Sequence, residues 1–548
     1  MSVQVKNLDH LGIVAGIIDQ IGIVDIIDEH LGRSSQQKVS TGQAVKAFIL
    51  NGLGFVSAPL YLYAGFFEGK ATEHLLGSKI TAEMLNDDLL GRSLDRLFKF
   101  GIGRIFSLIA MKAFECFALQ PKSYHLDSTS IAVHGEYASD ADMEGEELDQ
   151  SDSLGVEDAP QIIRITHGYS RDHRPDLKQF MIDMICSGDG GIPLAINLGN
   201  GNQNDQTVFA QRIVAFRQQW DFEGLFVADS ALYSAENLKR LGSLQWLTRV
   251  PLTLKSAQQA VSEVSPDTFQ ACKHEGYRYA TLCSDYAQVQ QRWVIFESEK
   301  SRASDLKALE KRVRKADAEV SRQIKQLAQQ EFECHDDALK QGQQLGKNWR
   351  FHRIESVEVE MKEHYGKRGR PKPEEQPQRV TYHVKVKSVI DEDVVAREQR
   401  KAGRFILATN VLDEQKLSAD ELLSRYKEQQ YPERGWRFLK DPLFFTSSIF
   451  LKTPRRIMAL AMVMGLSLMV YTLAERQLRQ ALQASEQTVP SQTKKPTQKP
   501  TLRWIFQCFQ SIHVLWLEGR KLVSNLTDFH LQVLKLLGSH CQKYYCLS

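Results

Sequence analysis

The chain has 548 residues, too many for one ordinary domain, and two to four domains are expected. Hydrophobic residues make up 42% and charged residues 25%, values that exclude a largely disordered or fibrous chain and favour a globular protein with a sizeable core. The formal net charge of +2 says little about partners, because acidic and basic clusters offset each other along the sequence.

Cysteine usage and the first residues bear on the compartment. The 8 cysteines are scattered, without a paired Cys-x-x-Cys or the spacing of a disulfide framework. Asp9, Asp19 and Asp25 interrupt the apolar residues of the N-terminus, which argues against a signal peptide. A reduced, cytoplasmic setting is therefore expected.

Residues 1–118 are expected to form an all-helical N-terminal domain. An apolar series runs from Val14 to Leu31, a second helix is expected from Thr41, and a third helical region from about residue 82 to 117. Such a module is a candidate for docking onto DNA or onto a partner subunit, although it has no clear helix-turn-helix pattern. A purely structural role stays open.

Residues 119–251 have the pattern of an α/β core domain. Ser123–Val133 alternates and is rich in β-branched residues, which predicts a strand with Asp127 near its middle or end. The acidic block from Glu136 to Asp158 is expected to be a solvated loop and not a metal cage. The elements predicted after it are a hairpin at 177–186 and 192–198, a helix from Asn204 or Asp205, a strand at 225–229 ending on Asp229, a helix at 234–241 and a strand at 246–250. This order predicts a mixed sheet.

Residues 252–402 are interpreted as an α+β insertion, with a charged helical segment at 302–345 and a β pair around a polar tip. Within the tip, Arg368-Gly369-Arg370-Pro371 resembles the AT-hook, whose arginines lie along a narrow minor groove. Arg368 and Arg370 are therefore candidate DNA contacts. A merely basic loop tip is the alternative.

The core pattern resumes at 403–484 and includes a run without formal charge, Ile457–Ala474. This run is long enough to cross a membrane, but a buried core helix has the same composition and is the expectation here. Residues 485–501 are expected to be a polar linker with Lys and Pro, and 502–548 a C-terminal helical segment.

Within this second part, the stretch from Arg425 to Lys440 stands out. Pro432 is predicted to be the first residue of a helix, which places Glu433 in the first turn. Arg437 and Lys440 follow at i+4 and i+7 on the face of Glu433. An acid beside two cations suits a site that holds metal and phosphate together, whereas an exposed helix with an ordinary ion-paired face is the alternative.

Three carboxylates occupy parallel places in the predicted core: Asp127, Asp229 and Glu433. Strand ends in one sheet meet at one edge, and hard divalent cations such as Mg²⁺ prefer clustered carboxylate oxygens. Two such ions would suit an in-line displacement at a phosphodiester, with Arg437 and Lys440 on flanking phosphates. Three unrelated surface acids are the alternative. Because the chain has no P-loop, no Ser-His-Asp order and no complete dinucleotide fingerprint, metal-dependent phosphodiester chemistry is the hypothesis that remains.

These residues carry a resemblance over nearly the whole chain. Leu126–Thr129, Gly168–Lys178, Val227–Ser230 and Tyr426–Lys440 are similar to a DDE transposase of a bacterial insertion sequence. The superfamily has a Tyr…Arg…Glu…Lys signature, and the group meant here has a helical N-terminal domain and a long insertion before the glutamate.

At the signature spacing this chain has Tyr426, Gln429, Glu433 and Lys440. Gln429 departs from the usual arginine, which removes one expected phosphate contact. Lys427 and Arg434 are candidates to replace it.

The resemblance implies an α/β RNase H-like mixed sheet flanked by helices, with catalytic and metal-binding roles for Asp127, Asp229 and Glu433. It implies two Mg²⁺ or Mn²⁺ ions, cleavage at terminal inverted repeats of double-stranded DNA, transfer of the freed 3′ ends to target DNA, and a homodimer in a paired-end complex. The candidate DNA contacts are Tyr426, Arg434, Arg437, Lys440, Arg368 and Arg370. An inactive transposase-derived DNA-binding protein and a nuclease without strand transfer are the alternatives, and a membrane protein is the least expected.

Overall fold

The computed structural model describes residues 4–33, 37–55, 62–134, 137, 161–220, 223–366, 376–441, 451, 453–517 and 520–547. The chain divides into two compact units, one made of Met1–Thr248 and Leu423–Ser548 and the other of Arg249–Leu422. The second unit includes the strand at 404–409, which was predicted to belong to the core and not to the insertion. The acidic block, apart from Tyr137, and the arginine tip with Arg368 and Arg370 lie outside the described residues.

The N-terminal part of the first unit is helical, as predicted, apart from one short strand. Ser40 caps α3 in a capping box: the Gln43 amide donates to Ser40 Oγ at 3.1 Å, and the Ser40 amide donates to Gln43 Oε1 at 2.9 Å. The elements are β1 (Gln4–Asn7), α1 (Leu11–Ile21), α2 (Ile23–Leu31), α3 (Thr41–Gly52), α4 (Tyr63–Phe67), α5 (Thr72–Leu76), η2 (Ala82–Met84), α6 (Asp87–Phe100) and α7 (Ile102–Cys116).

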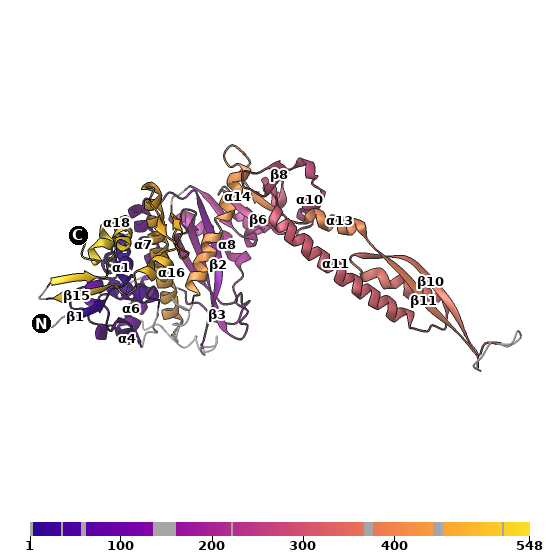
Figure 1. Cartoon of the computed structure of the whole chain (residues 1–548), viewed down its shortest axis with the longest axis horizontal. Coiled ribbons are helices and arrows are strands. Elements are labelled where there is room, and N and C mark those ends of the chain that lie inside the picture. Colours follow the sequence, from indigo (N-terminus) through magenta and orange to yellow (C-terminus); the bar gives the residue numbers. More distant parts are fainter. Residues whose placement is uncertain are drawn as a thin grey trace. The chain divides into compact units, whose positions relative to one another are not determined.

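The C-terminal segment returns to this helical part, and it is not all-helical as predicted. Strand β15 lies between β1 and β16 in an antiparallel sheet, with Gln4 opposite Trp516 (Figure 1). Strands of five residues leave little local signal, and β1, one of the two partners of β15, is some 500 residues away, so the all-helical prediction was wrong. The predicted linker likewise contains a short strand pair. The elements are β13 (Val489–Pro490), β14 (Pro496–Thr497), α17 (Leu502–Cys508), β15 (His513–Leu517), β16 (Arg520–Ser524), α18 (Asp528–Leu537) and α19 (Ser539–Tyr544).

His10 joins the two ends of the chain inside the first unit. Its Nε2 donates to the Leu53 carbonyl at 2.8 Å, Gln510 donates to its Nδ1 at 3.1 Å, and its ring stacks on Phe506. Complete burial lowers the pKa of His10 to about 4. The imidazole is therefore neutral at physiological pH, and it serves as a core hydrogen-bonding group.

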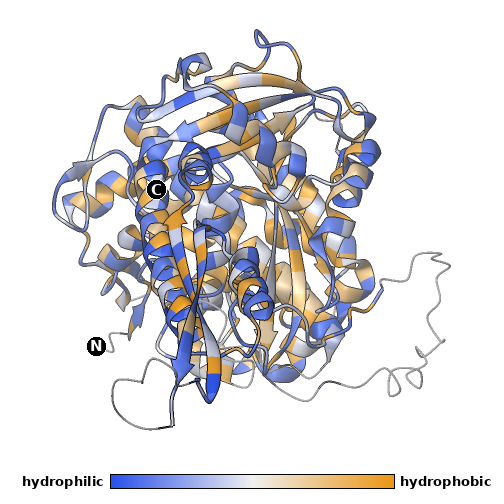
Figure 2. Cartoon of the chain, turned by 90° about the vertical axis from the view of Figure 1, so that its right-hand side faces the viewer, coloured by the Kyte–Doolittle hydropathy of each residue, from blue (hydrophilic) through white to orange (hydrophobic). Residues whose placement is uncertain are grey.

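The sheet of the first unit has the strand order β4-β3-β2-β5-β6. β2, β3 and β4 form an antiparallel meander, whereas β5 and β6 run parallel to β2. This arrangement is the predicted RNase H-like mixed sheet, and its strands are mostly buried. Hydrophobic and hydrophilic residues are mixed along the strands and helices of the chain (Figure 2). The elements are β2 (Ser123–Val133), β3 (Lys178–Ser187), β4 (Pro193–Gly199), α8 (Asp205–Gln219), β5 (Leu225–Ala228), η4 (Ser230–Leu232), α9 (Ala235–Leu241) and β6 (Trp246–Val250).

Two further helices of the first unit follow the insertion: α15 (Gln430–Leu439), which packs against β2 and β3, and α16 (Pro454–Ala484). By length and composition α16 could cross a membrane, but 89% of its apolar window is buried inside the protein, against α3, α6, α18 and β4. It is a core helix, as predicted, and no membrane localisation is indicated.

The second unit combines helices with antiparallel strands. One sheet has the order β12-β9-β8-β7, and helix α11 runs alongside the separate β10–β11 pair (Figure 1). In the first sheet, buried Glu297 receives hydrogen bonds from Arg404 at 2.9 Å and Arg278 at 2.6 Å. The elements are α10 (Lys255–Glu263), η5 (Pro266–Thr268), β7 (Gln270–Ala271), β8 (Tyr277–Ser284), η6 (Tyr286–Gln288), β9 (Gln291–Ser298), α11 (Glu299–Ala328), α12 (His335–Gln344), η7 (Leu345–Asn348), β10 (His352–His364), β11 (Arg379–Ile390), α13 (Glu392–Lys401), β12 (Arg404–Thr409) and α14 (Ala419–Lys427), whose last residues belong to the first unit.

Candidate active site

Asp127 and Asp229 lie side by side on neighbouring strands. Asp127 is in the middle of β2, and Asp229 directly follows β5. In the parallel pairing Leu126 is opposite Ala228, so the next residue on each strand is one of the two aspartates. Asp229 also caps the short helix η4, because its Oδ1 accepts a hydrogen bond from the Ala231 amide at 2.9 Å. The sheet thus brings together two acids that are a hundred residues apart.

The electrostatics of this pair are unfavourable to two negative charges. Burial and the neighbouring Asp229 charge raise the pKa of Asp127 to about 7. Burial also raises the pKa of Asp229. Adjacent carboxylates in a poorly solvated place hold a proton unless a cation shares the charge.

Arg171 supplies one positive charge near the pair. It comes from the polar turn before β3, donates to the Ser128 carbonyl and, at 3.0 Å, to Ser128 Oγ, and forms an ion pair with Asp205. Its charge lowers the pKa of both Asp127 and Asp229 and so opposes the effect of burial. Arg171 belongs to Gly168–Lys178, one of the segments that carry the family resemblance, but no role was predicted for it.

Helix α15 presents Trp436 to the aspartates. The indole Nε1 donates to Asp127 Oδ2 at 3.1 Å, which fixes the orientation of that carboxylate. The helix begins at Gln430, two residues before the predicted start, so Pro432 lies inside the first turn, where an N–H has no intrahelical partner anyway. Glu433 is one turn before Trp436 on the same side and is exposed.

The carboxylate of Glu433 does not join the aspartates in this structure. No three His, Cys, Asp or Glu side chains among the described residues lie close enough together to hold a metal ion. The donor chemistry nevertheless fits a divalent cation, because Asp127 and Asp229 offer hard oxygen ligands whose mutual repulsion a cation would relieve. Glu433 is on the helix that contacts Asp127, and its predicted role as a third ligand stays a prediction.

Lys440 directly follows the last residue of α15, on the same side of the helix as Glu433. Its ammonium lies 2.8 Å from the Asp172 carboxylate, next to Arg171 in the same turn. Arg437 is exposed on that side of the helix. Tyr426, at the end of α14, is half-buried. Arg434 points to another side of the helix and lines a cavity that neither aspartate lines.

Gln429, the residue that departs from the signature arginine, is buried and faces β2. Its Oε1 accepts from His125 Nδ1 at 3.0 Å, and its Nε2 donates to the Leu126 carbonyl at 2.8 Å. Glu428 adds a second link, because it accepts a hydrogen bond from Ser123 Oγ at 2.9 Å. This network ties the start of α15 to the strand residues just before Asp127. Burial makes Gln429 a structural residue here, and sequence spacing alone could not show that.

Comparison with known families identifies the core. A family model described as a transposase DDE domain matches residues 123–473. The chain belongs to the DDE transposase family. A second model, a domain of unknown function (DUF4277), matches residues 3–111 of this transposase. A bacterial insertion-sequence origin remains a prediction.

Solved structures and curated proteins add little to this assignment. The cryo-EM structure of a piggyBac transposase synaptic complex with hairpin DNA is 10% identical, with a TM-score of 0.39 over 93% of this chain and 83% of that chain. No argument about this transposase rests on so distant a likeness. The comparison with curated proteins found no match.

Proposed function

We propose that this DDE transposase binds the inverted-repeat ends of its own element in double-stranded DNA, cleaves there, and joins the freed 3′ ends to target DNA. The proposal is carried by the paired, half-buried aspartates Asp127 and Asp229 inside the segment that matches the transposase DDE domain. It places the protein in the cytoplasm, on DNA, as a homodimer that pairs two ends.

In the cleavage step, water attacks the scissile phosphorus, a new P–O bond forms, and the bond to the 3′ oxygen breaks. In the joining step, the freed 3′-hydroxyl attacks a target phosphodiester and displaces another 3′ oxygen, so the number of P–O bonds is unchanged. Mg²⁺ or Mn²⁺, held by Asp127, Asp229 and Glu433, would supply an activated nucleophile and neutralise charge on the leaving oxygen when bound.

The chain's own residues would prepare the site for both steps. Trp436 holds the Asp127 carboxylate in one orientation through its 3.1 Å hydrogen bond. Lys440, held by Asp172, and Arg437 are positioned on one helix face to contact phosphates that flank the scissile bond. Arg171 balances part of the negative charge of the aspartates while the DNA is absent.

The test uses a labelled duplex that carries an inverted-repeat end from the DNA flanking the gene, incubated with Mg²⁺ and either wild type or Glu433→Gln. The wild type is expected to cut and join, whereas Glu433→Gln is expected to bind the duplex without cutting it, since the amide keeps the size of the side chain and removes its charge. Glu486→Gln, a change at another exposed glutamate, is the matched control and is expected to retain activity.

The same assay separates the two alternatives. Cleavage without joined products would indicate a nuclease, and binding without any cleavage by the wild type would indicate an inactive DNA-binding protein. Equal cleavage by wild type and Glu433→Gln would show that Glu433 is an ordinary acid on a helix face.

A further inference from the structure

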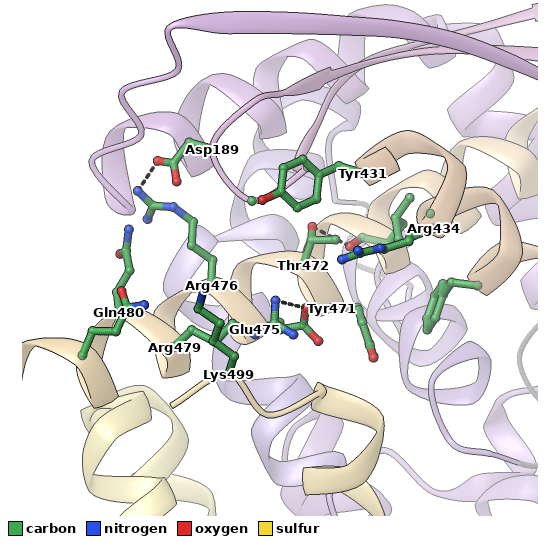
Figure 3. A pocket seen from close by; sticks show the side chains of 16 residues that line it. Asp189, Tyr431, Arg434, Tyr471, Thr472, Glu475, Arg476, Arg479, Gln480 and Lys499 are labelled. Atoms are coloured by element: carbon green, nitrogen blue, oxygen red, sulfur yellow. Dashed lines mark hydrogen bonds and ion pairs between the residues drawn. The ribbon is translucent and has the colours of Figure 1, made fainter. Parts of the chain in front are cut away.

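A cavity adjoins α15, and neither Asp127 nor Asp229 lines it. It has a volume of ≈ 500 Å³ and lies among the β3–β4 turn, α15, α16 and the segment before α17. Figure 3 shows the side chains of Tyr431 and Arg434 extending from α15, Arg476 and Arg479 from α16, and Lys499 from the segment before α17. We call this cavity the basic pocket.

The lining of the basic pocket has an excess of positive charge. Arg434, Arg476, Arg479 and Lys499 contribute four cations, and its two carboxylates are Asp189 and Glu475. The formal charge of the described lining is therefore +2. Such an excess around a concave site attracts an anion.

The two carboxylates are already committed to arginines of α16. Arg476 forms an ion pair with Asp189 and donates to the Phe117 carbonyl at 3.2 Å. Arg479 pairs with Glu475 at 2.8 Å, and Glu475 also accepts a hydrogen bond from the Leu502 amide at 2.9 Å. These contacts hold the wall of the pocket in place, and the Arg434 charge also acts on Glu475.

Two exposed basic side chains, Arg434 and Lys499, retain capacity for a ligand, and Arg476 lies buried beside them. The Arg476 side chain is only 9% exposed, and its buried Nε has no hydrogen-bond partner. Within the described part of the chain, neither Arg434 nor Lys499 pairs with a carboxylate, and both side chains are exposed. Arg434 donates to Gln430 Oε1 at 3.5 Å and lies over the Tyr431 ring, which leaves other guanidinium N–H groups for a ligand. Two exposed basic side chains beside a third guanidinium suit the oxygens of a phosphate group.

The position of the basic pocket next to Glu433 indicates a backbone phosphate of the DNA that enters the active site. Arg434 follows Glu433 directly, so the two side chains point about 100° apart around α15. A DNA strand bound at Glu433 would therefore pass close to Arg434, which lines the basic pocket. The β3–β4 turn closes the pocket through Gly191, where an added Cβ would lie 2.6 Å from Tyr431 Cβ.

We propose that the basic pocket binds a backbone phosphate of the DNA that enters the active site, with Arg434 and Lys499 as its exposed contacts. This proposal rests on the proposed function, because it assumes that DNA is the substrate. Binding in the pocket is independent of base sequence, since only phosphate oxygens are contacted.

The test measures the affinity of the full chain for a labelled duplex over a series of salt concentrations, without Mg²⁺ so that no cleavage occurs. Lys499→Gln is compared with Lys495→Gln, which removes the same charge from an exposed lysine of the same segment outside the pocket. Each lost phosphate contact lowers the slope of log affinity against log salt by about 0.9. We expect that loss for Lys499→Gln and for Arg434→Gln, with no change for Lys495→Gln.

Further arms make the outcomes distinct. Lys499→Arg keeps the charge and is expected to restore the wild-type slope, and thermal unfolding of each variant shows whether it is folded. Equal salt slopes for all variants, or equal losses of slope for Lys495→Gln and Lys499→Gln, would contradict phosphate binding in the basic pocket. The proposed function would not be affected by either result. Failure of the wild type to bind DNA would overturn both.

Discussion

Helix α15 separates two sites of opposite charge. On one side Trp436 contacts Asp127, next to Asp229, and burial together with the Asp229 charge raises the pKa of Asp127 to about 7. On the other side Arg434 lines the basic pocket, where cations exceed carboxylates. The acidic side is suited to chemistry that needs a cation, and the basic side to holding a polyanion. One ten-residue helix therefore couples the two, because any shift of α15 moves both.

The largest effect is expected when the acidic side loses a ligand. Asp229→Asn is expected to lower the rate of end cleavage on the order of 10³-fold or more, because several kcal/mol of transition-state stabilisation depend on its charge. Affinity for the duplex should change little. Lys499→Gln should do the reverse, with weaker binding and an unchanged cleavage rate at saturating DNA. If Lys499→Gln slowed cleavage as much as Asp229→Asn, the assignment of catalysis to the acidic side and of DNA binding to the basic side would be wrong.

The acidic side should also respond to pH and to divalent cations. Because the pKa of Asp127 is raised, the folded protein binds this proton more tightly than the unfolded chain does. The free energy of unfolding therefore falls as pH rises from about 4 to about 7, by a few kcal/mol at most, since each pKa unit corresponds to about 1.36 kcal/mol.

Mg²⁺ should offset this fall in the free energy of unfolding only at pH values where Asp127 is ionised. We expect Mg²⁺ to raise the thermal unfolding midpoint at about pH 8 and to have little effect at about pH 5, as measured by circular dichroism. Asp229→Asn should abolish the response, and Glu486→Gln should retain it. An identical Mg²⁺ response in Asp229→Asn would place the cation elsewhere.

The smallest of these effects concerns the attachment of α15 to the sheet. Gln429→Ala leaves His125 Nδ1 and the Leu126 carbonyl without their buried partner, so the free energy of unfolding should fall by about 1–3 kcal/mol. The neighbouring exposed Gln430→Ala is the control, and its effect should stay within about 0.5 kcal/mol. Denaturant unfolding measures both, and equal values would mean that the network does not stabilise the start of α15.

The sequence by itself determined the helical N-terminal part, the order of strands that gives the mixed sheet, and the assignment of Ile457–Ala474 to the core. These features depend on local periodicity and on turn residues, which act over a few positions. It also indicated that Asp127 and Asp229 would meet, because parallel neighbouring strands place equivalent positions together.

Only the tertiary structure decided which way the side chains around α15 face. The sequence showed only that Gln429 replaces the signature arginine and removes a phosphate contact, whereas the structure shows that Gln429 is buried against β2 and hydrogen-bonded to it. The strand pair β1–β15 and the basic pocket assemble residues from distant segments, such as Arg434 and Lys499, whose local sequence does not encode their partners. The physical reason is that pairing and charge clustering across long sequence separations arise only when the core packs.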